Sequence, residues 1–172
     1  LLMGVAREKR LKHYVVVDER SAAFFALGMV QRLGEPVAVV CTSGSALLNY
    51  APAISEAYYQ RLPLLVVSAD RPVAWIDQDD SQTIRQHGIL QNIVKASFEL
   101  VGEVRDEEER WLAVRMVNDA IECAVKGRRG PVHINVPLRE PLYGQREWNQ
   151  MEHVRNIERI DGGDIIAPEV MS

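Results

Sequence analysis

Residues 36–59 read PVAVVCTSGSALLNYAPAISEAYY, and this stretch decides the fold class. It opens with a continuous apolar run, residues 36–42, which is entered through the breaker pair Glu35-Pro36. A short polar turn follows, and then a helical pattern over 44–60. An apolar run without polar alternation is typical of a strand that is covered on both faces, as in a parallel sheet. We therefore expect a strand, a turn and a helix in this order.

The same alternation runs along the rest of the chain. Further strands are expected at four places: YVVVD (14–18), LPLLVVSAD (62–70), KASFEL (95–100) and GPVHINVP (130–137). Further helices are expected over 20–33, 82–94 and 106–126, the last with Asp106 as its N-cap. This order predicts an α/β fold with a doubly wound, mainly parallel sheet and helices on both faces.

Length and composition bound the domain organisation and the class of protein. The patterning fades after Pro141, so we expect one domain over 1–144, truncated at its start, and an interdomain linker over 145–172 of a larger protein. The 172 residues carry a net charge of −4, which offers no basic surface to nucleic acid or anionic membrane. No apolar run approaches the roughly 20 residues of a membrane span. Cys41 and Cys123 are interpreted as reduced core thiols of a cytoplasmic protein, and His133 as a core histidine with its hydrogen bonds satisfied.

Polar groups follow three of the expected strands. They are Asp18-Glu19-Arg20, Thr42-Ser43-Gly44-Ser45 and Asp70-Arg71-Pro72. Each has an ordinary alternative, respectively a helix-start carboxylate, an N-cap and a turn with an ion pair. Ligands of such sheets bind at the carboxyl ends of the strands, and all three groups are expected on that one edge. The sequence therefore predicts a binding site there.

Five stretches of the sequence resemble a known family. VDERSAAFFALGMV, TSG, ADRP, SQTIRQ and GPVHINVPLREPLYG are similar to the pyrimidine-binding domain of thiamine-diphosphate enzymes. They most resemble the 2-succinyl-5-enolpyruvyl-6-hydroxy-3-cyclohexene-1-carboxylate synthase family of menaquinone biosynthesis. The resemblance runs from residue 1 to about residue 144 and implies that the first strand of the domain is missing from this chain.

The resemblance assigns roles to residues of this chain. It implies that Glu19 is catalytic and binds the aminopyrimidine ring of thiamine diphosphate, and that Thr42, Ser43 and Gly44 also bind the cofactor. It places Arg71 and Gln82 near the substrate. It also implies a Mg²⁺ ion whose ligands lie outside this chain, so that no metal ligand is expected here and the chain alone is expected to be inactive.

The reaction implied is decarboxylation of 2-oxoglutarate and addition of the resulting succinyl carbanion to isochorismate, by a cytoplasmic transferase. A homo-oligomer, dimer or tetramer, is also implied. It agrees with the helix over 20–33, which is apolar on too many sides for one sheet to cover. Two alternatives stay open. One is another thiamine-diphosphate carboligase or decarboxylase of the acetolactate-synthase type, and the other is a non-catalytic α/β binding module.

Overall fold

A computed structural model of the chain describes residues 1–139. In chain order, the described elements are α1 (Leu2–Arg7), α2 (Glu19–Leu33), β1 (Val37–Cys41), α3 (Ser45–Asn49), α4 (Ala51–Gln60), β2 (Leu64–Asp70), a 3-10 turn η1 (Val73–Trp75), β3 (Ala96–Glu99), α5 (Glu107–Val125) and β4 (Val132–Pro137). The expected linker over 145–172 lies outside the described residues. None of the described helices is long and apolar enough to cross a membrane.

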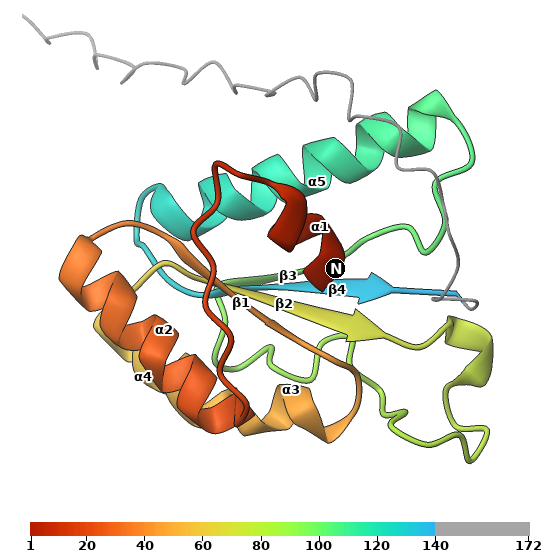
Figure 1. The fold of residues 1–172 in the computed structure, drawn as a ribbon, viewed down its shortest axis with the longest axis horizontal. Helices are drawn as coiled ribbons and strands as arrows, with labels where there is room; N and C mark the ends of the chain where they lie inside the picture. Colours follow the sequence, from red (N-terminus) through yellow and green to blue (C-terminus); the bar gives the residue numbers. More distant parts are fainter. Residues whose placement is uncertain (140–172) are drawn as a thin grey trace, which may run out of the picture.

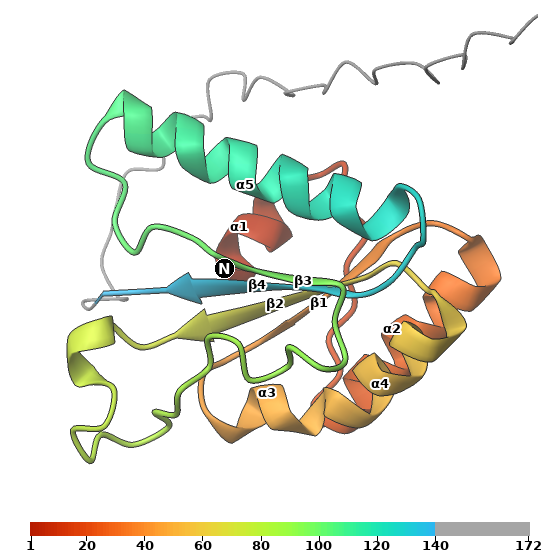
Figure 2. The same ribbon diagram turned by 180° about the vertical axis from the view of Figure 1, so that it is seen from behind.

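The four described strands form one sheet in the order β1-β2-β4-β3, and every pairing is parallel. Helices α2, α3 and α4 lie against one face and α5 lies against the other (Figures 1 and 2). The predicted doubly wound α/β fold is therefore confirmed. The strands begin and end within two residues of the apolar runs at 36–42, 62–70, 95–100 and 130–137.

Each face of the sheet has its own apolar core. On one side, the β1 and β2 side chains pack against α2, α3 and α4 and against Leu90 and Val94 of the segment 73–94. On the other side, Val132, Ile134 and Val136 of β4 pack against the α5 residues Ala120 and Ala124. Burial of these apolar side chains is the main driving force for this arrangement.

The expected strand at 14–18 was wrong. These residues belong to the link between α1 and α2, residues 8–18, which passes from the α5 side of the sheet to the start of α2 (Figure 1), and Val17 is 97% exposed. The ring of Tyr14 packs edge-on against Phe25 of α2, with the centroids 5.7 Å apart. A strand needs a hydrogen-bonded neighbour, and within the described chain no segment pairs with this one.

The expected helix at 82–94 was also wrong, and the one at 44–60 is divided. Residues 82–94 form turns, with positive φ at Gln82 (54°) and Gly88 (73°). The helical spacing of its apolar residues instead reflects the anchoring of Leu90 and Val94 in the core. The expected helix over 44–60 changes direction between α3 and α4, where Pro52 lies at the start of α4 and has no N–H to continue the first helix. The helices expected over 20–33 and 106–126 were confirmed as α2 and α5.

Candidate functional site

The first part of the site is the start of α2. The side chain of Asp18 caps the helix by accepting a hydrogen bond of 2.7 Å from the backbone N–H of Ser21, which holds the pKa of Asp18 below its usual value. Glu19 follows as the first helical residue and is half-buried. Capping by Asp18 thus leaves the Glu19 carboxylate for another purpose.

Glu19 lies close enough to the carboxyl end of β1 for its charge to act on groups there. Burial, and then the negative charge of Glu19, raise the pKa of the Cys41 thiol to about 12. The pKa of Tyr50 is also raised, by burial first and then by the charges of Cys41 and Glu19. The Tyr50 hydroxyl donates a hydrogen bond of 2.8 Å to the carbonyl of Val40. The structure therefore brings Glu19 to the strand end that leads into Thr42-Ser43-Gly44, and its neighbours there are neutral.

The turn after β1 depends on Gly44. Its φ is +77°, and a Cβ atom at this position would lie 2.9 Å from the carbonyl oxygen of Gln82. Its backbone N–H donates a hydrogen bond of 2.7 Å to Oε1 of the buried Gln86. The Gly44 amide is thus bonded within the fold, and its lack of a side chain allows the close approach of the Gln82 backbone. Ser43 is buried in the turn and Thr42 is exposed.

The carboxyl end of β2 carries Asp70 and Arg71. Asp70 is buried, and its carboxylate accepts hydrogen bonds from Nδ2 of Asn135 (2.7 Å) and from the backbone N–H of Arg71 (2.8 Å). Burial nevertheless raises the pKa of Asp70. Nε of Arg71 lies 3.3 Å from a carboxylate oxygen of Asp80, so the loop after η1 orients this guanidinium.

Beneath these residues lies a polar network that the sequence analysis did not anticipate. Ser68 donates a hydrogen bond of 2.9 Å to Oδ1 of Asn135 and lies 2.8 Å from Nε2 of His133. Because the single hydroxyl hydrogen of Ser68 goes to Asn135, Nε2 of His133 is the donor in its bond with Ser68. The alternation of polar residues along two apolar strands, at 68 and 70 and at 133 and 135, was the signal that could have revealed this network.

His133 was expected to have both ring nitrogens hydrogen-bonded, but in the described part of the chain only one of them is. Its Nε2 is bonded to Ser68, but its buried Nδ1 has no hydrogen-bond partner in the described part of the chain. Burial, and then the charge of His87, lower the pKa of His133 to about 4, which keeps the ring neutral. His87 itself is exposed and pairs with Glu99 at 2.8 Å. Residues 1–139 contain no group of three His, Cys, Asp or Glu side chains that could hold a metal ion.

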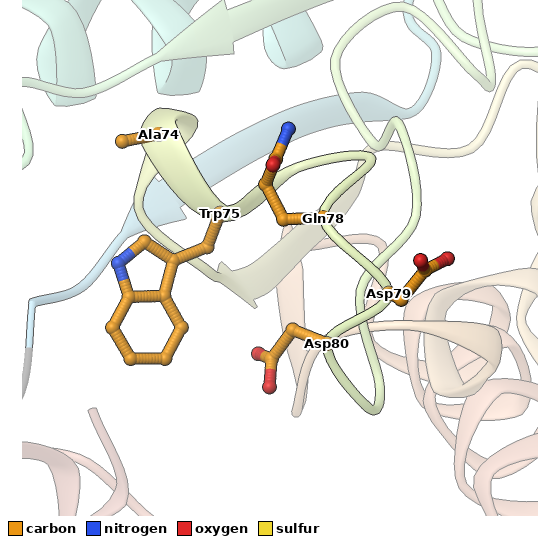
Figure 3. A pocket seen from close by; sticks show the side chains of 5 residues that line it. All are labelled: Ala74, Trp75, Gln78, Asp79 and Asp80. Carbon is orange, nitrogen blue, oxygen red and sulfur yellow. The ribbon is translucent and has the colours of Figure 1, made fainter.

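Two hollows lie beside the end of β2. One, of about 260 Å³, is bordered by Asp70, Gln86, Glu99 and five neighbours. The other, of about 420 Å³, follows η1 and is shown in Figure 3, where the Trp75 ring and the Asp80 carboxylate lie on one side of it and Asp79 points away. Asp80 thus contacts both Arg71 and the second hollow. Gln82, in the loop that follows, is exposed.

Comparison with known proteins identifies the family. Residues 1–96 match the family described as "Thiamine pyrophosphate enzyme, N-terminal TPP binding domain". The chain belongs to the thiamine pyrophosphate enzymes. All the candidate residues, from Glu19 to Gln82, lie within the matched part of this N-terminal domain.

Relatives among these thiamine pyrophosphate enzymes share one name. The chain is 53% identical over 147 residues to a 2-succinyl-5-enolpyruvyl-6-hydroxy-3-cyclohexene-1-carboxylate synthase of Cytophaga hutchinsonii, covering 86% of this chain and 26% of the relative. It is 51% identical over 144 residues to the synthase of the same name from Porphyromonas gingivalis, covering 84% and 25%. The chain thus spans about a quarter of the length of the curated relatives it matches.

The geometry of this TPP-binding domain fits a thiamine cofactor. A half-buried carboxylate, Glu19, stands among neutral neighbours where it can hydrogen-bond a heterocyclic ring. The turn 42–44 offers the exposed side chain of Thr42, while Gly44 lets the Gln82 backbone pack closely against the turn. Both features lie at the carboxyl edge of the sheet, where ligands of doubly wound folds bind.

Proposed function

We propose that this chain is the pyrimidine-binding part of a 2-succinyl-5-enolpyruvyl-6-hydroxy-3-cyclohexene-1-carboxylate synthase of menaquinone biosynthesis. The complete enzyme would decarboxylate 2-oxoglutarate and add the remaining succinyl unit to isochorismate. One observation carries the proposal. Half-buried Glu19 lies near Cys41, the last residue of β1 before the Thr42-Ser43-Gly44 turn, in a chain about half identical to synthases of this name.

Glu19 is the proposed catalytic residue. When bound, thiamine diphosphate supplies a nucleophilic carbon and an electron sink for decarboxylation of a 2-oxo acid. Glu19 would hold a proton between its carboxyl oxygen and a nitrogen of the aminopyrimidine ring, as a general acid–base group. Cys41, with a pKa of about 12, stays a neutral thiol and does not compete for this proton. Thr42, Ser43 and Gly44 would line the ring.

Arg71 and Gln82 are the proposed substrate-binding residues. Both substrates carry carboxylates, which a guanidinium binds through parallel N–H donors. Asp80 contacts Nε of Arg71 and would fix the plane in which that guanidinium meets a substrate. Gln82 lies on the same edge, with its backbone against Gly44, so its amide would reach a ligand in contact with the turn.

The remaining elements of the proposal concern the rest of the enzyme. The Mg²⁺ ion that accompanies the cofactor would be bound by residues outside this chain. The outer side of α2 exposes Phe24 (44%) and Phe25 (49%), which supports cover by a second subunit in a homodimer or homotetramer. We place the enzyme in the cytoplasm, where its free cysteines would stay reduced.

The test is a comparison of substrates on the complete protein. We expect consumption of 2-oxoglutarate only when isochorismate, thiamine diphosphate and Mg²⁺ are all present, and no turnover of pyruvate. Turnover of pyruvate instead would favour an enzyme of the acetolactate-synthase type. A calorimetric titration that detects no thiamine diphosphate binding would favour a non-catalytic module and overturn the proposal.

A further inference from the structure

The side chain of Gln86 joins the turn after β1 to the ends of two other strands. Gln86 is fully buried, at 0% exposure, in a segment that otherwise consists of turns. Its Oε1 accepts the backbone N–H of Gly44 at 2.7 Å. Its Nε2 donates to the carbonyl of Ala69 (3.0 Å) on β2 and to Oδ1 of Asn135 (2.9 Å) on β4. One amide therefore connects β1, β2 and β4 at their carboxyl ends.

The chemistry of these contacts requires a primary amide. Gln86 needs one acceptor for Gly44 and two donor hydrogens for Ala69 and Asn135, and only Asn and Gln carry both on one group. Glutamate has the same shape but loses both donors, and methionine loses every bond. Each loss removes a hydrogen bond from the buried polar atoms of Gly44, Ala69 or Asn135, which is costly in a dry interior, although Oδ1 of Asn135 keeps its bond from Ser68.

The segment that carries Gln86 also packs against the Gly44 turn through the backbone of Gln82. A Cβ on Gly44 would lie 2.9 Å from the Gln82 carbonyl oxygen, so the backbones at 44 and 82 are close to contact. Gln86 lies four residues after Gln82 and holds the other side of Gly44 through its N–H. The distance between the turn and the segment that carries Gln82 is therefore fixed by one buried side chain.

We infer that Gln86 is a positioning residue that sets the cofactor-binding turn and the substrate-binding segment in one fixed relation. The inference rests on the proposed function. Gln86 is fully buried, and its side chain acts on the turn through the Gly44 amide, against which the Gln82 backbone packs. Its partner Asn135 also holds Asp70, the residue before Arg71, which extends the same relation to the end of β2.

The experiment compares Gln86→Glu and Gln86→Met in the complete enzyme, with Gln91→Ala as a matched control on the same segment, where the side chain is exposed. Calorimetric titration gives the thiamine diphosphate dissociation constant, and kinetics give KM for 2-oxoglutarate. Hydrogen exchange of a peptide over residues 42–50 reports the protection of the Gly44 amide. We expect Gln86→Met to weaken cofactor binding and raise KM by about tenfold or more, as unsatisfied buried groups predict, and to speed exchange at the turn.

The pH dependence separates positioning from simple loss of packing. At pH 8 the carboxylate of Gln86→Glu faces two acceptors, whereas at pH 6 a protonated carboxyl regains one donor. We expect cofactor affinity of Gln86→Glu to recover severalfold on acidification, and that of Gln86→Met not to recover. The charged or titratable groups around this position are Asp70, Glu99, His133, His87 and Arg85. Wild type and Gln91→Ala contain them all, so their titration cancels in the comparison.

Three results would overturn this inference, and the first of them would also overturn the proposed function. A wild-type enzyme that binds no thiamine diphosphate would overturn the proposed function and this inference together. Cofactor affinity and KM within twofold of wild type for both Gln86 variants, in an enzyme that binds the cofactor, would overturn the inference alone. Equal losses for Gln86→Glu and Gln86→Met at both pH values would show a packing role and would also overturn it.

Discussion

Strands β2 and β4 present two very different faces to their surroundings. Under α5, β4 offers only Val132, Ile134 and Val136, which pack against two alanines of the helix. On the opposite face β2 begins apolar, at Leu64 and Val66, and both strands carry polar side chains toward their carboxyl ends. The polar part comprises Ser68, Asp70, His133 and Asn135, all of them buried.

The two faces contribute differently, because the apolar face mainly stabilises the fold and the polar face mainly fixes the geometry of the sheet edge. Apolar burial under α5 contributes to folding in proportion to the area buried but fixes no orientation at the sheet edge. Buried hydrogen bonds contribute modestly to stability, yet they are directional and costly to leave unmade. The polar face thus holds the ends of β2 and β4 in one arrangement at the edge of the sheet that carries Arg71 and the Gly44 turn. Substitutions on the two faces should therefore have different consequences.

The largest expected effect is at Glu19, on the polar side of the sheet. Glu19→Gln in the complete enzyme should lower turnover by about 10²–10⁴-fold, because the amide keeps the shape but cannot share a proton with the ring. Thermal unfolding should stay close to wild type, since Asp18 still caps α2. A variant that keeps more than about a tenth of wild-type turnover would exclude this role for Glu19.

A pair of neighbouring substitutions on β4 compares the faces directly. Ile134→Ala, under α5, should reduce the free energy of unfolding by about 2–5 kcal/mol. It should leave the thiamine diphosphate affinity of the folded enzyme unchanged. Asn135→Ala, on the polar face, should cost about 1–3 kcal/mol and weaken cofactor binding severalfold, because Gln86 and Asp70 each lose a partner. Urea unfolding measures the free energy of unfolding, and calorimetric titration measures the thiamine diphosphate affinity. Equal effects of the two substitutions on affinity would contradict the different roles of the two faces.

The apolar part of this architecture could be predicted from the sequence better than the polar part. Continuous apolar runs predicted β1 to β4, and the rule that parallel strands end on one edge placed Gly44 and Arg71 after the ends of β1 and β2. Glu19 follows no strand in the described part of the chain, so that rule does not account for its position near Cys41. The run at 14–18 failed because composition cannot show whether a neighbouring strand exists to pair with it. The segment 82–94 failed because Leu90 and Val94 have helical spacing although the backbone follows turns.

Gln86 shows why some site residues escape sequence reasoning. It lies 42 residues from Gly44 along the chain, and nothing in the motif SQTIRQ states which glutamine is exposed and which is buried. The structure separates them, since Gln82 is exposed and Gln86 is wholly buried. A long-range contact to a backbone N–H leaves no periodicity in the sequence.

The next prediction concerns pH and the buried histidine of the polar face. His133 has a pKa of about 4 in the fold and the usual value of 6.5 when unfolded. The unfolded chain therefore binds more protons between these values, so the stability due to His133 falls as pH is lowered from 6.5 to about 4. The expected loss is about 3 kcal/mol. The raised pKa of Asp70 acts in the opposite direction. The folded protein gains stability as the pH falls and this carboxyl becomes protonated.

The difference between the stability curves of wild type and a variant without the histidine gives the contribution of His133 to the pH dependence. Urea unfolding of wild type and His133→Leu, at several pH values from 7 to 4, gives the two stability curves. The leucine variant should be less dependent on pH over this range, while it retains the contribution of Asp70. Parallel curves would show that folding does not lower the pKa of His133.

The smallest expected effect lies on the outer side of α2, the helix that covers the polar side of the sheet. Phe25 is 49% exposed there beside Phe24, and its ring packs against that of Tyr14. We expect this chain to self-associate through that surface, and Phe25→Asp to weaken the association by roughly 1.5–3 kcal/mol, the value of burying one large apolar side chain. Gln91→Asp adds the same charge at an exposed position of the segment 73–94 and should leave association unchanged. Sedimentation velocity over a range of concentrations measures both, and a wild-type chain that stays monomeric at high micromolar concentration would show that the outer side of α2 does not pair with a second copy.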